Sequence, residues 1–110
     1  NNLTYKNMKL KLPHIKVPFV ATREQMITKL NKAYPTLFIK TTEEFNGGKG
    51  GIWSSSEAGV TAKDGHRLFN YNAVGKKYDS GVHKAIGNLL EKNGWYAEWY
   101  DCGTIMFWLV

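Results

Sequence analysis

The feature that most constrains the fold is an apolar helical stripe close to the C-terminus. Asp79 or Ser80 is placed to cap the start of this helix, and Gly94 suits the left-handed residue that follows its end. The pattern therefore predicts a helix that runs to about Asn93. Five apolar residues recur on its one face: Val82, Ala85, Ile86, Leu89 and Leu90.

The residues after this helix predict a β-hairpin. Apolar side chains alternate along residues 95–100 and 104–110, on either side of a turn at residues 101–103. The final strand is apolar on both faces, so it is either central in the sheet or covered by another chain. A homodimer through this C-terminal strand is therefore one hypothesis. The residues expected to share a face of each strand are Trp95, Ala97 and Trp99 in the first and Ile105, Phe107 and Leu109 in the second.

A first helix is predicted over residues 22–34. Thr22 and Gln25 have the spacing of a capping box, and Pro35 disfavours helical geometry at the residue before it. Between the helices, residues 37–45 and 51–56 are strand-like around a glycine-rich turn. Short strands at residues 60–63 and 66–70 are predicted around Asp64-Gly65, which suits a type I′ turn.

These elements predict one α+β domain over residues 1–110, close to the commonest domain size. We expect a mainly antiparallel sheet of about five or six strands with two helices on one face. Residues 1–20 contain a segment (residues 8–20) that alternates apolar and basic side chains and includes Pro13 and Pro18, which cannot donate to a strand ladder. They are therefore expected to form a basic extended arm or an edge strand.

Positive charge is concentrated in the first third of the chain. Residues 1–40 contain eight Lys or Arg and one Glu, a net charge of +7, whereas residues 41–110 contain seven basic and eight acidic residues, a net charge of −1. Such asymmetry favours binding to nucleic acid or to an acidic protein surface, and the alternative is a solvated face that aids solubility. The candidate phosphate contacts are Lys9, Lys11, Lys16, Arg23, Lys29 and Lys32. Tyr96 and Tyr100 are candidates for stacking on unpaired bases.

No pattern for catalysis or for a cofactor stands out. Lys49 lies among glycines but is not followed by Ser or Thr and a helix, as a phosphate-binding loop requires. The three histidines and Cys102 lack the close spacing of metal ligands, so neither a metal nor a cofactor is expected. Glu98 stands between aromatic residues that could raise its pKa. An enzyme whose site assembles from distant residues, among them His66, His83, Glu98 or Cys102, remains the second alternative to a binding module.

Two resemblances are visible in these residues. The phrases Gly81-Val82-His83-Lys84 and Gly94-Trp95-Tyr96-Ala97-Glu98-Trp99-Tyr100, with Gly103-Thr104, resemble small accessory proteins of bacteriophages, which implies no particular activity. The helix–strands–helix order of residues 22–93 resembles the double-stranded RNA-binding domain. However, residues 78–81 interrupt the basic helix start of that family, and no site residue carries over.

The chain is expected to be a cytoplasmic protein without a membrane span. A single cysteine cannot form an internal disulfide, which is typical of a reducing compartment. The longest apolar run is residues 105–110, far short of the roughly 20 residues of a spanning helix. Residues 1–11 contain no continuous apolar run, so no signal peptide is expected.

Overall fold

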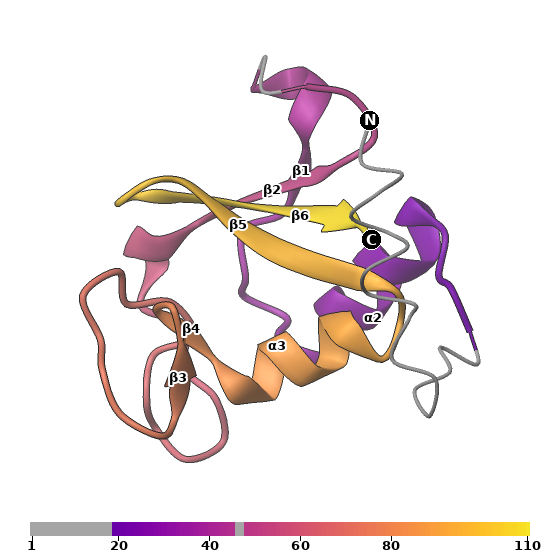
Figure 1. The fold of residues 1–110 in the computed structure, drawn as a ribbon. Helices are drawn as coiled ribbons and strands as arrows, with labels where there is room; N and C mark the ends of the chain where they lie inside the picture. Colours follow the sequence, from indigo (N-terminus) through magenta and orange to yellow (C-terminus); the bar gives the residue numbers. More distant parts are fainter. Residues whose placement is uncertain (1–18, 46–47) are drawn as a thin grey trace.

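Four antiparallel strands form the main sheet of the computed structural model, which describes residues 19–45 and 48–110 (Figure 1). Their spatial order is β1, β2, β6, β5, so the C-terminal strand is paired on both sides. In the terminal hairpin, Trp95 pairs with Leu109, and Trp99 pairs with Ile105, which confirms the predicted faces. The strands are β1 (Lys40–Thr41), β2 (Ile52–Ser55), β5 (Trp95–Asp101) and β6 (Thr104–Leu109).

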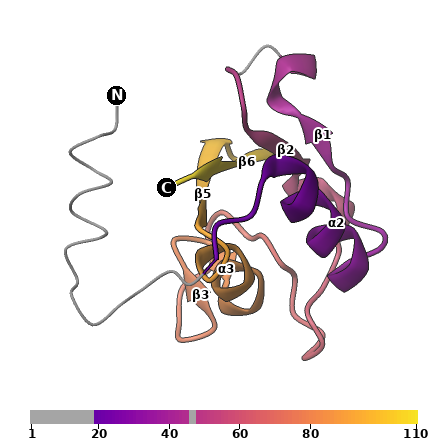
Figure 2. The same ribbon diagram turned by 90° about the vertical axis from the view of Figure 1, so that its right-hand side faces the viewer.

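Two helices, α2 (Arg23–Ala33) and α3 (Lys84–Glu91), cover one face of this sheet (Figures 1 and 2). The predicted capping box begins α2. The Thr22 hydroxyl accepts the N–H of Gln25 at 3.1 Å, and the Gln25 side-chain oxygen accepts the N–H of Thr22 at 2.9 Å. The structure therefore confirms the α+β class with both helices on one side.

The core lies between the helices and the sheet. Trp95 is fully buried, and its indole N–H donates to the carbonyl of Ala21 at 2.9 Å. This bond joins the residues before α2 to strand β5. The backbone N–H of Ala21 donates in turn to the carbonyl of Asn93, just after α3. These two bonds hold the start of one helix against the end of the other. The largest fully buried apolar side chains are Trp95, Phe107, Met26, Leu30, Ile52, Leu68, Ile86, Leu90 and Ile105.

The second helix begins later than predicted, because residues 78–83 form a β-hairpin. Its strands are β3 (Tyr78–Asp79) and β4 (Val82–His83), and Ser80 and Gly81 occupy the turn with φ of 49° and 79°. Two consecutive positive φ angles suit a tight hairpin turn and end any helical geometry there. Neither Asp79 nor Ser80 therefore caps α3; His83 does so.

The central β region is also shorter than predicted. Residues 37–45 contribute β1 and then the 3₁₀ turn η1 (Thr42–Glu44), and β2 is followed by a second such turn, η2 (Ser56–Ala58). The hairpin predicted around Asp64 is reduced to one bridge, between Thr61 and Arg67, and only Gly65 has a positive φ there. The six strands are thus divided between a four-stranded and a two-stranded sheet.

Two further predictions concern the N-terminal residues and the C-terminal strand. The extended arm predicted for residues 1–20 lies almost wholly outside the described residues. Both edges of β6 are paired, one with β2 and the other with β5, and the homodimer expected through this strand remains a prediction. Within the described ranges, no helix is long and apolar enough to cross a membrane.

Candidate functional site: a lysine groove between the two helices

A groove of about 1120 Å³ separates α2 from α3 and extends to the loop at residues 62–64. Four lysines line it, and we call it the lysine groove. Lys29 and Lys32 belong to α2, and Lys63 belongs to the loop. Lys92 is the residue that directly follows α3. The remaining lining residues are Phe19, Ala33, Tyr34, Ala62, Asp64, His83, Ala85, Leu89 and Asn93.

The four lysines are exposed and free to meet an anionic ligand. Among the described residues, none of them has a carboxylate within 4.0 Å. The ammonium of Lys29 lies 5.5 Å from the centre of the Phe19 ring, a cation–π contact that leaves its charge in place. Like charges that converge on a concave surface without counter-charges raise the local positive potential, which favours an anionic ligand.

The one carboxylate of the groove, Asp64, is already engaged. Its side chain accepts the N–H of His66 at 2.9 Å and lies 2.9 Å from Nε2 of His83, with Lys77 at 3.3 Å. The backbone N–H of His66, then the His83 and Lys77 contacts, hold the pKa of Asp64 far below its ordinary value, so the group is ionised at neutral pH. Its negative charge is balanced locally and does not neutralise the four lysines.

His83 joins this carboxylate to the start of α3. Nδ1 of His83 accepts the backbone N–H of Ala85 at 3.0 Å, so this nitrogen carries no proton. Nε2 is then the protonated nitrogen of the neutral ring and donates to Asp64. With both nitrogens in use, His83 has no free lone pair with which to accept a proton from a substrate. The pair acts as a latch that holds the loop at residues 62–64 against the helix.

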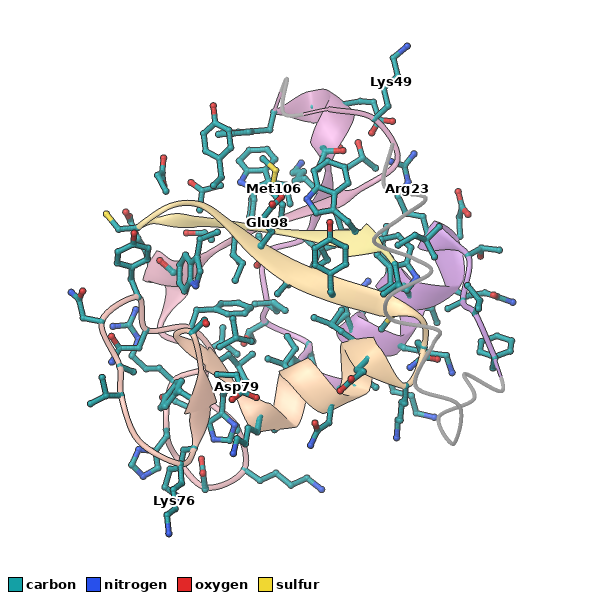
Figure 3. The ribbon with its side chains drawn as sticks, viewed as in Figure 1. Arg23, Lys49, Lys76, Asp79, Glu98 and Met106 are labelled. Atoms are coloured by element: carbon teal, nitrogen blue, oxygen red, sulfur yellow. The ribbon has the colours of Figure 1, made fainter. Side chains whose placement is uncertain are left out.

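Arg23 does not line the groove, because its side chain is bonded to the segment between β1 and β2. Its guanidinium donates to Glu43 at 2.7 Å and to the carbonyl of Gly51 at 3.2 Å. Glu43 also accepts the N–H of Gly50 at 2.9 Å. This backbone hydrogen bond, and next the one from Arg23, lower the pKa of Glu43 to about 2. The pair fixes the glycine turn (residues 48–51), where Lys49 projects far from α3 (Figure 3).

The candidate stacking residues lie on the other face of the sheet. Alternation along β5 places Tyr96, Glu98 and Tyr100 opposite the face that packs on the helices. Glu98 and its register partner Met106 project away from α3 (Figure 3). Tyr100 is 58% exposed and contacts Phe45 with ring centres 5.0 Å apart. The sheet therefore separates these tyrosines from the lysine groove.

Of the predicted phosphate contacts, the structure brings Lys29 and Lys32 together in the lysine groove. Lys9, Lys11 and Lys16 lie outside the described residues. The groove also contains two lysines that the sequence did not indicate as phosphate contacts, Lys63 and Lys92. No local pattern marks these two, because their proximity to α2 arises only when the two helices pack together.

The candidates for chemistry do not converge. Cys102 is exposed in the β5–β6 turn, and Glu98 projects from the far face of the sheet (Figure 3). Only His83 and the backbone of His66 meet, at Asp64. In the part of the chain that the structure describes, no three His, Cys, Asp or Glu side chains are grouped so as to hold a metal ion.

Comparison with protein families, curated proteins and solved structures found no significant match to this chain. Its function is therefore inferred from the geometry and charge of its own residues.

Proposed function

We propose that this protein is a nucleic-acid-binding module whose phosphate site is the lysine groove. The observation that carries the proposal is the convergence of four exposed lysines, from three separate segments, on one concave surface without free counter-charges. Lysines that neutralise phosphates release bound counterions, so this attraction supplies most of the affinity in sequence-independent binding.

The net charge of the chain supports the same ligand. A charge of +6 on 110 residues draws the protein to polyanions in general, and the groove supplies a place where that charge is focused. The Asp64–His83 latch supports the groove further, because it holds Lys63 beside α3. Without this bond the loop that carries Lys63 would be joined to the helix by fewer contacts.

The test is fluorescence anisotropy with labelled single- and double-stranded oligonucleotides at about 50 and 200 mM salt, where phosphate contacts produce a steep fall in affinity. Lys63→Glu and Lys49→Glu form a matched pair, since both replace an exposed loop lysine and change the net charge equally. We expect Lys63→Glu to weaken binding and to lower the slope of log affinity against log salt by at least about one. Lys49→Glu should alter neither by a comparable amount.

Equal effects of the two variants would show that net charge, rather than the lysine groove, attracts the ligand. Absence of binding at the lower salt would refute the proposal and favour an acidic protein partner.

A second candidate function is self-association through the outer face of the sheet. Exposed Tyr100 there contacts Phe45, and Phe45 and Phe38 both pack on Trp53, which makes an aromatic surface on the side away from the helices. Tyr100→Glu is the appropriate variant, because Phe107 is fully buried in the core and its replacement would test folding instead. A dimer in solution that Tyr100→Glu dissociates would establish this function, and a monomer at all concentrations would exclude it.

A further inference from the structure

The lining of the lysine groove is mainly apolar, although four lysines belong to it. We call five of the other lining residues the floor of the groove: Phe19, Ala33, Tyr34, Ala85 and Leu89. These side chains are not all withdrawn into the core. Ala33 and Ala85 are exposed, and Phe19 is 44% exposed, so a ligand in the groove would contact them.

Such a floor adds nothing to the recognition of phosphates alone. A phosphate backbone needs charged or hydrogen-bonding partners, and in a duplex the apolar faces of the bases are already stacked inside the helix. Unpaired bases, in contrast, present flat apolar faces whose burial against rings and aliphatic groups is favourable and independent of sequence.

One ring of the groove is placed for such a contact. Phe19 is 44% exposed, and the Lys29 ammonium lies over its ring at 5.5 Å from the centre, so a base that stacks on the uncovered part of the ring has a phosphate partner beside it. Tyr34 adds a polar group to the floor. Burial raises the pKa of its phenol, so the hydroxyl keeps its proton and can donate to a base or a phosphate.

We infer that the lysine groove binds unpaired nucleotides, with the phosphates on its four lysines and the bases against its apolar floor. This inference rests on the proposed function and specifies its ligand as single-stranded nucleic acid. The groove volume of about 1120 Å³ exceeds the roughly 300–1,000 Å³ of a small-molecule pocket, which leaves room for more than one nucleotide.

The experiment compares three labelled probes of equal length: a mixed-sequence single strand, the same strand with abasic residues throughout, and the corresponding duplex. The first two carry the same phosphates and differ only in their bases. At about 50 mM salt we expect the single strand to bind at least about tenfold more tightly than the abasic strand, as the loss of one good stacking contact would give. The duplex should bind more weakly than the single strand.

Two variants separate the roles of floor and rim. Phe19→Ala, at an exposed position, should weaken binding of the single strand severalfold and leave the abasic strand unchanged. Lys63→Glu should weaken both probes. Equal affinity for the single strand and the abasic strand, tighter binding of the duplex, or an equal effect of Phe19→Ala on both strands would overturn the inference and leave the proposed function standing. Failure of all three probes to bind would overturn both.

Discussion

Replacement of His83 by Ala tests whether the His83 side chain stabilises the start of α3 as its geometry indicates. The change removes the acceptor for the N–H of Ala85, and loss of an N-cap costs about 1 kcal/mol. It also removes the edge contact with Tyr78, whose ring centre lies 5.4 Å away, worth about 0.5–1.5 kcal/mol. We assign nothing to the bond with Asp64, because water can replace the lost donor at a side chain that is one third exposed.

The expected cost of His83→Ala is therefore about 2 kcal/mol in the free energy of unfolding. A domain of this size has about 5–15 kcal/mol in total, so the variant should still fold. Urea unfolding, followed by the fluorescence of the four tryptophans, measures the change as a lower midpoint at unchanged slope.

Two further variants identify the cause. His66→Ala is the matched control, because this exposed histidine contributes only its backbone N–H to Asp64, and we expect a change within about 0.5 kcal/mol. His83→Asn supplies a good capping oxygen without the ring and should recover about 1 kcal/mol. If His83→Ala costs less than about 0.5 kcal/mol, or if Asn is no better than Ala, the argument that the His83 side chain caps α3 is wrong.

Three other predictions concern the glycines and the anchored glutamate. A Cβ at Gly51 would lie 2.5 Å from the Trp108 ring, so Gly51→Ala should cost about 1–3 kcal/mol in urea unfolding. Gly87→Ala should instead stabilise the protein by about 0.5–1 kcal/mol, because Gly87 is helical and the nearest atom to its new Cβ is a methyl of Val82 at 4.0 Å; a loss of stability would contradict this. The folded-state pKa of Glu43 is lowered from 4.5 to about 2, so the stability that its ionised form contributes is present above about pH 4.5 and is lost as the pH falls toward 2. Unfolding measured between about pH 5 and pH 2 should show a smaller acid-dependent loss in Glu43→Gln, and identical profiles would refute the role of this carboxylate.

The sequence alone predicted the elements whose signals are local. The capping box at Thr22 and Gln25 placed the start of α2, because the partners of its hydrogen bonds lie three residues apart. Alternation along residues 95–109 predicted the faces of the terminal hairpin, since a strand repeats every two residues whatever surrounds it. The excess of positive charge also required no structure.

At the start of α3, two local patterns predicted different structures, and the sequence did not show which structure forms. The apolar stripe from Val82 to Leu90 is helical in period, yet Ser80 and Gly81 adopt left-handed conformations and turn residues 78–83 into a hairpin. Val82 remains buried in either arrangement, so hydrophobic periodicity could not decide between them. The cap by His83 was likewise hidden, because histidine is not among the preferred capping residues.

The site was decided by tertiary structure. Lys63 is about thirty residues from Lys32 and from Lys92, which are themselves sixty residues apart, and only the packing of both helices around Trp95 brings the three to one groove. Periodicity determines which face of a single element is buried, but it carries no information on which exposed faces of different elements become neighbours. The sequence therefore determined that this protein is basic and α+β, and the packing of its core decided where the charge is gathered.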